Sequence, residues 1–245
     1  MSLTSSSYDD LERIWGKIAE DVAARPSLQG AADVFLDAFH AQFADELILS
    51  RVFATSEFGG LPAIDQAFVR AAAHSAGVLE KLEQSTNVLS LLATRGREAA
   101  WNEREKSASH LGIPLISEQF VQEIPMIVRL LGETGFDPNW YGLPSSNFVT
   151  PSFANVNGLF YVEEAKMARD ELGRRIIPAQ DFVSRYGVRS VFGIGGTYVS
   201  QSMFLAITFF CATHVTRQQA MKFLPLVSLF KAASTRAITR RAIFE

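Results

Sequence analysis

The chain has 245 residues, of which 48% are apolar and 20% are charged, and its formal net charge at pH 7 is −3. This length and apolar content provide for a sizeable core and exclude disorder as the main state of the chain. The slight negative charge argues against a nucleic-acid-binding protein, because such modules normally carry a concentrated basic face. We expect no transmembrane helix either, since no apolar run reaches the required length of about 18 residues.

The first part of the chain has the pattern of two helices, a strand and a third helix. Apolar residues recur at helical spacing over 8–24, behind an acidic first turn, and again over 31–43. Residues 47–58 are rich in branched and aromatic side chains and are followed by Gly59-Gly60, which predicts a strand and its end. The next helix is predicted at about 64–73.

A strand predicted at 88–94 leads into a polar segment, residues 95–115. Arginine forks bind carboxylate or phosphate through two parallel hydrogen bonds, and an indole stacks on planar ligands. We therefore interpret the segment as a contact to an anionic or planar ligand, made by Arg95, Arg97, Trp101, Asn102 and His110. The alternative is a solvated helix or an internal salt-bridge network, because glutamates at 98, 103 and 105 nearly balance the positive charges.

The region after the polar segment is predicted as a helix followed by a long loop. Ser117 is a candidate N-cap, Pro125 is expected to kink the helix, and Gly135 is expected to end it. Residues 137–150 are rich in Pro, Gly, Ser and Asn, which indicates a linker or a long loop.

Order returns with a strand predicted at 158–162, and a short helix predicted at 179–186 presents Asp181 and ends at Gly187. Two apolar runs follow, Val188–Tyr198 and Met203–Phe210, and they are close enough to pair as a hairpin.

The glycines of the first apolar run, Gly193 to Gly196, are interpreted as turn residues. A dinucleotide-binding loop would need a helix after them, and here another strand follows. A long amphipathic helix over 216–238 is expected to cover the sheet.

This order of strand, hairpin and helix over about 158–238 resembles the C-terminal half of a GAF domain, a small-molecule sensor module whose last helix often pairs with a partner chain. The resemblance is looser over 31–115. It implies an α+β fold with an antiparallel GAF- or PAS-like sheet flanked by N- and C-terminal helices. Residues 1–30 would form a helical extension, and residues 31–245 the sensor domain, with a long insertion at about 95–150.

By this resemblance the protein is a regulatory domain for signal transduction that binds a small molecule. We expect no output domain of its own, since no GGDEF-type, kinase-type or phosphodiesterase motif is present. The ligand would lie between the sheet and the helices and loop that cover one face. This placement adds Tyr161, Asp181 and Tyr198 to the expected ligand contacts. The sequence does not allow a cofactor to be predicted.

Two other functions stay open. One is a small hydrolase or transferase that uses the polar segment, with His110 as base and Asp181 or Glu98 orienting it; the other is an interaction scaffold with a fully packed core. We favour the sensor function over the enzyme function. The four histidines lack metal-site spacing and no Gly-x-Ser-x-Gly elbow occurs, so we expect no metal and assign no catalytic residue.

The cellular setting and the oligomeric state are expected from a few residues. A polar start, Met1–Tyr8, predicts no secretory signal, and a single cysteine, Cys211, agrees with a reducing cytoplasmic compartment and a packing role. Apolar residues on the terminal helices exceed what one sheet face was expected to cover, which predicts a homodimer through these helices. The residues concerned are Leu11, Ile14, Trp15, Ile18, Phe223, Val227, Phe230 and Ile238. A signalling partner protein is a further expectation.

Overall fold

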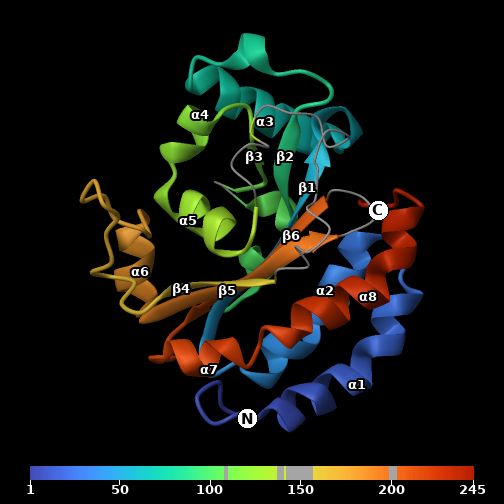
Figure 1. The fold of residues 1–245 in the computed structure, drawn as a ribbon, viewed down its shortest axis with the longest axis vertical. Coiled ribbons are helices and arrows are strands. Elements are labelled where there is room, and N and C mark those ends of the chain that lie inside the picture. Colours follow the sequence, from blue (N-terminus) through green and yellow to red (C-terminus); the bar gives the residue numbers. More distant parts are fainter. Residues whose placement is uncertain (108–109, 137–140, 142–156, 199–202) are drawn as a thin grey trace.

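A computed structural model describes residues 1–107, 110–136, 141, 157–198 and 203–245 of the chain. The described residues form a mixed helix and strand structure around one six-stranded antiparallel sheet (Figure 1). The α+β class predicted from the sequence is therefore confirmed at this level.

The sheet consists of two three-stranded meanders joined edge to edge. Its order is β3-β2-β1-β6-β5-β4, so the first strand pairs with the last strand at the centre. A register shift in the β1–β2 ladder lies between Val52 and Phe53. The strands are β1 (Leu47–Glu57), β2 (Asn87–Gly96), β3 (Gly112–Pro114), β4 (Gly158–Val162), β5 (Ser190–Tyr198) and β6 (Met203–Cys211).

Helices cover both faces of the sheet. In Figure 1, α1, α2 and α8 lie together on one side of the sheet, whereas α4, α5 and α6 lie on the other. The helices are α1 (Tyr8–Ala24), α2 (Leu28–Gln42), α3 (Ala63–Ser75), α4 (Glu118–Gln122), α5 (Pro125–Glu133), α6 (Gln180–Tyr186), α7 (Arg217–Met221) and α8 (Pro225–Thr239). In the described part of the chain, no helix is long and apolar enough to cross a membrane.

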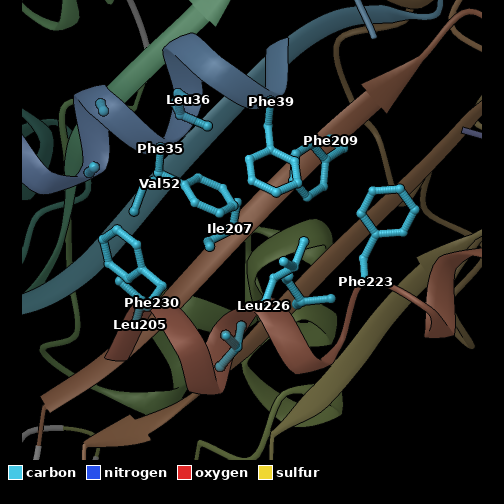
Figure 2. Close-up of a cluster of buried hydrophobic side chains, with 14 of the residues drawn as sticks. Phe35, Leu36, Phe39, Val52, Leu205, Ile207, Phe209, Phe223, Leu226 and Phe230 are labelled. Atoms are coloured by element: carbon cyan, nitrogen blue, oxygen red, sulfur yellow. The ribbon is translucent and has the colours of Figure 1, made fainter. Parts of the chain in front are cut away.

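The larger core lies between the sheet and α1, α2 and α8 (Figure 2). Phe35 of α2 stacks on Phe39 at 4.4 Å between ring centroids, and it meets Phe230 of α8 edge to face at 5.5 Å. Burying a large apolar side chain contributes about 1.5–3 kcal/mol relative to exposure, so these rings are a main stabilising element of the fold.

This core contains the residues that were expected to form a dimer surface. All eight apolar residues expected to form a dimer surface on the terminal helices are buried inside the same chain. Their burial removes the surface on which the expectation was based. The homodimer itself stays a prediction, to be checked by sedimentation.

The second core lies between the other sheet face and the helices α4, α5 and α6. Helix α5 sits close to the sheet because strand glycines face it. A Cβ atom added at Gly195 would lie 3.0 Å from Cβ of Thr134 and 2.8 Å from the carbonyl oxygen of Leu205, and one at Gly193 would lie 3.1 Å from Leu130. These glycines therefore permit close approach of helix and sheet.

The turn assignment of Gly193 to Gly196 is consequently wrong. All of these residues belong to β5, and the described glycines with positive φ are Gly77, Gly135, Gly173 and Gly187. The predicted hairpin is confirmed, since β5 and β6 pair from Ser190↔Cys211 to Tyr198↔Met203.

Helix ends follow the predicted capping chemistry in several places. The hydroxyl of Ser117 accepts a hydrogen bond from the amide of Phe120, and Pro125 separates α4 from α5 instead of kinking one helix. Gly187 ends α6 with φ of 68°, as predicted. The predicted 216–238 helix is also divided, into α7 and α8, with Pro225 at the first turn of α8.

Candidate functional site

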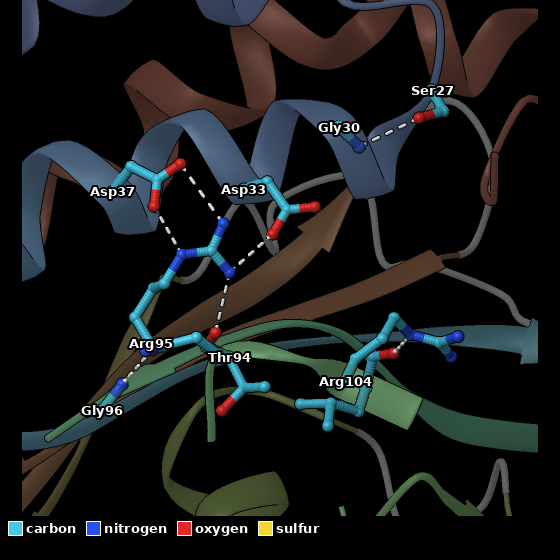
Figure 3. A network of polar contacts seen from close by, with 10 residues as sticks. Ser27, Gly30, Asp33, Asp37, Thr94, Arg95, Gly96 and Arg104 are labelled. Atoms are coloured by element: carbon cyan, nitrogen blue, oxygen red, sulfur yellow. Dashed lines mark hydrogen bonds and ion pairs between the residues drawn. The ribbon is translucent and has the colours of Figure 1, made fainter. Parts of the chain in front are cut away.

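Arg95 is held by two carboxylates of α2 (Figure 3). It belongs to β2, which extends further than predicted, and its side chain points toward the helix. One guanidinium nitrogen lies 2.9 Å from Asp33, and two others contact Asp37. Burial raises the pKa of Asp33, and the positive charge of Arg95 offsets part of this rise. The expected ligand-binding fork is thus occupied by an internal ion-pair network.

Arg97 and Asn102 also bind the protein itself. Arg97 donates to the carbonyl oxygens of Leu47 at 3.2 Å and Asp45 at 2.7 Å, and the side-chain oxygen of Asn102 accepts from the amide of Gly96 at 2.9 Å. These contacts fold the start of the polar segment back onto the sheet.

Trp101 packs against α6. It lies in the 3-10 helix η3 (Ala99–Asn102), with its ring 4.6 Å from Tyr186 and 5.6 Å from Phe182. Asp181 lies in the first turn of α6 and is exposed. The structure therefore places Trp101 near the helix that carries Asp181, although the indole faces aromatic rings and not the carboxylate.

The two expected tyrosines face the opposite core. The hydroxyl of Tyr161 donates to the carbonyl oxygen of Val215 at 2.8 Å, and that of Tyr198 shares a 2.7 Å hydrogen bond with Ser234 of α8. Both rings belong to the core of α1, α2 and α8. Burial raises the pKa of Tyr161 and of Tyr198, so both phenols stay neutral at physiological pH.

His110 is held in its neutral form by its surroundings. Burial lowers its pKa to about 4, and the positive charge of Arg51 acts in the same direction. Arg51 belongs to the central strand β1 and is not among the residues expected at a site.

The eight expected ligand contacts therefore do not converge on one site. Arg95 and Tyr198 contact α2 and α8, and Tyr161 lies in the core on the same sheet face, whereas Trp101 packs on α6. Glu98, proposed for the alternative enzyme, accepts a hydrogen bond from Tyr186 at 3.0 Å. Within the described ranges, no group of three or more His, Cys, Asp or Glu residues is arranged to hold a metal ion.

A different polar group lies at the centre of the sheet. Arg51 stands opposite Thr94 of β2 and opposite Thr208 of β6, so the three side chains form one row across three strands. The residues two positions away on β1, Leu49 and Phe53, belong to the core beneath α5. Because alternate residues of a strand share a face, the row of Arg51, Thr94 and Thr208 lies on this same face.

Three polar atoms of this row lack a hydrogen-bond partner in the described part of the chain. Nε of Arg51 and the hydroxyl oxygens of Thr94 and Thr208 are buried, and they have no hydrogen-bond partner among the residues that the structure describes. Each such group costs about 1–3 kcal/mol when it loses water without gaining a partner. Buried polar groups in native proteins normally have partners, so this row marks a candidate site for an external ligand.

One sequence signal for this site existed. Leu49, Arg51 and Phe53 occupy alternate positions of a predicted strand, and a charged residue within such an apolar alternation is placed toward the core. The two threonines give no signal of this kind, since their alignment with Arg51 depends on the strand register.

No family model matches the chain, and a search of the curated proteins finds no match.

Proposed function

We propose that this protein is a regulatory small-molecule-binding domain whose ligand binds at the sheet face that carries Arg51. The observation that carries the proposal is that Nε of Arg51 and the hydroxyl oxygens of Thr94 and Thr208 are buried in one row without a hydrogen-bond partner among the described residues. A domain built only as a scaffold gains stability by replacing such a row with apolar side chains. A ligand that supplies the missing acceptors gives the row a physical reason.

The architecture supports a sensor of GAF or PAS type. It combines a single antiparallel sheet with a C-terminal hairpin, a covering last helix and helices on both faces. The resemblance seen in the sequence over 158–238 is the second support for this assignment. The family membership, like the cytoplasmic location and the partner protein, is part of the proposal.

The central strand offers a route from ligand to helices. Arg51 faces the proposed ligand, and its neighbour Val52 faces the opposite core, where it joins Phe35 of α2 and Phe230 of α8 in one cluster (Figure 2). A ligand that moves or rigidifies β1 therefore acts on the packing of these helices. Regulation would follow as a shift between packing arrangements, provided that the ligand binds them with different affinity.

The first test is native mass spectrometry of the purified protein, followed by a thermal-shift screen of nucleotides, organic acids and aromatic metabolites. We expect a retained or screened compound, and we expect it to slow amide hydrogen exchange in β1, β6 and α8. A compound that slows exchange only outside β1 and β6 would place the ligand elsewhere. No bound compound and no stabilising compound would contradict the proposed function.

A further inference from the structure

We propose that the ligand is anchored by a single carboxylate group, which Arg51 binds through its guanidinium fork while the hydroxyls of Thr94 and Thr208 donate to the same group. This inference rests on the proposed function and names the chemical class of the ligand.

Arg51 is positively charged at neutral pH. Burial lowers its pKa to about 10, which still leaves the guanidinium protonated at neutral pH. Within the described part of the chain, no carboxylate forms an ion pair with it. Arg51 is half-buried, and a charge taken partly out of water without a counter-ion is costly, so an anion is the ligand group that relieves the largest penalty.

Arg51 and the two threonines offer hydrogen-bond donors that suit a carboxylate. A guanidinium presents its N–H groups in a planar fork that matches the two oxygens of a carboxylate, and a hydroxyl can turn to donate one hydrogen bond. Arg51 is flanked by one threonine on each neighbouring strand. Three side chains able to donate, from β2, β1 and β6, thus lie side by side in one row with Arg51 in the middle.

The row provides one positive charge to a ligand. His110 stays neutral near this row, Arg104 is paired with Asp65, and Arg129 is paired with Glu133 at 2.7 Å. Arg51 therefore contributes a single positive charge, with neutral donors beside it. This balance favours a monoanion over a phosphate dianion, which would leave one negative charge uncompensated in a buried place.

Apolar side chains lie next to Arg51 on this face of the sheet. Leu49 and Phe53 flank Arg51 along β1, Leu91 lies on β2 and Phe210 on β6, and all four belong to the core on this face. Apolar surroundings favour an apolar body behind the carboxylate. We therefore expect an aromatic or aliphatic carboxylic acid, and not a sugar acid or an amino acid.

The test compares carboxylic acids with their neutral amides. Benzoate, phenylacetate and hexanoate are titrated into the full chain beside benzamide, phenylacetamide, hexanamide and inorganic phosphate, and the Nε–H resonances of the arginines are followed by NMR. We expect the acids to shift the Arg51 resonance and to bind at least about tenfold more tightly than the amides, as a charge-assisted hydrogen bond implies.

Three variants separate the possible roles of the row. Arg51→Met should bind acids and amides with similar affinity, whereas Arg51→Lys should keep part of the preference for acids. Thr208→Val should weaken the binding of acids with little effect on that of amides. Arg13→Met is the matched control, because Arg13 is exposed on α1. A merely structural Arg51 would not affect the difference between acid and amide.

The outcomes are distinguishable. If neutral compounds bind at β1 and Arg51→Met does not change their affinity, the sensor proposal holds and the carboxylate inference fails. Tighter binding of phosphate than of every carboxylate also overturns the inference. If neither acids nor amides affect any resonance of β1 or β6 at millimolar concentration, the inference is likewise overturned.

Discussion

Arg104, in the polar segment, pairs with Asp65 of α3, and both side chains are buried. The exposed fractions of the two side chains are 8% and 0%. Arg104 also donates to the carbonyl oxygen of Leu91 at 2.9 Å (Figure 3). The pair therefore ties the polar segment to α3 and to β2, and it explains why this charge-rich segment folds against the sheet.

The first prediction concerns this pair. Arg104→Met should lower the free energy of unfolding by about 3–5 kcal/mol, because it leaves the carboxylate of Asp65 buried without a counter-ion. Urea denaturation measures the change. Lys106→Met is the control from the same segment, since the Lys106–Glu103 pair is exposed and should contribute less than about 1 kcal/mol. Equal effects of the two substitutions would contradict the structural role of Arg104.

The second prediction is that Arg95 stabilises the fold. Arg95→Met should cost about 1 kcal/mol and no more, because Asp33 and Asp37 are 32% and 62% exposed and solvent screens their attraction. The loss should shrink in molar salt. The expectation from sequence was different, since it made Arg95 a ligand contact. Unchanged stability at low salt, together with weaker ligand binding, would restore that expectation.

The third prediction concerns the close contact of α5 with the sheet. Gly195→Ala should destabilise the protein by about 1–3 kcal/mol, because its methyl group would crowd Thr134 and Leu205. Gly16→Ala is the control, since open space surrounds this glycine in α1. Alanine there should raise stability by about 0.5–1 kcal/mol through its helix propensity. Thermal melting of both variants tests the pair, and a stabilised Gly195→Ala would refute the proposed contact.

The fourth prediction concerns pH. The pKa of His110 is about 4 in the folded chain, below its ordinary value of 6.5, so the unfolded chain binds the proton first as pH falls. The contribution of His110 to stability should be complete above pH 6.5 and should be lost progressively toward pH 4. Urea denaturation of His110→Gln should show a weaker pH dependence in this window than wild type, and an equal pH dependence of the two would contradict the prediction.

The same histidine reports on Arg51. Arg51→Met removes a positive charge that lowers the pKa of His110, so its NMR titration should move upward. An unchanged titration would show that the two side chains are not coupled.

Local patterns in the sequence predicted most of the elements and not the site. Spacing of apolar residues, the Ser117 cap and the Gly187 stop are local signals, and they place helix starts and ends correctly, although two predicted helices are each divided in two at Pro125 and Pro225. The strand glycines were misassigned because their role depends on α5, which lies far from them in the sequence. All but Tyr141 of the predicted loop at 137–150 lies outside the described residues, and the division of the chain at residue 30 stays a prediction.

The expected site residues were chosen by chemistry and by position on one segment. Their partners lie on distant elements, such as Asp33 for Arg95 and Ser234 for Tyr198, and only the tertiary structure reveals that these side chains are already engaged. Arg51 shows the reverse case. It lies in an ordinary strand pattern, and its importance depends on a buried Nε that has no hydrogen-bond partner among the described residues.

The most direct test of this account is the stability of Arg51→Met without ligand, measured by urea denaturation. An arginine kept for binding is a burden to the empty protein, so the account predicts a free energy of unfolding equal to or above that of wild type, with an unchanged denaturant slope. Thr94→Val and Thr208→Val should behave in the same way. A loss of about 2 kcal/mol or more in Arg51→Met would show that Arg51 supports the fold itself, and it would contradict a ligand site at the centre of the sheet.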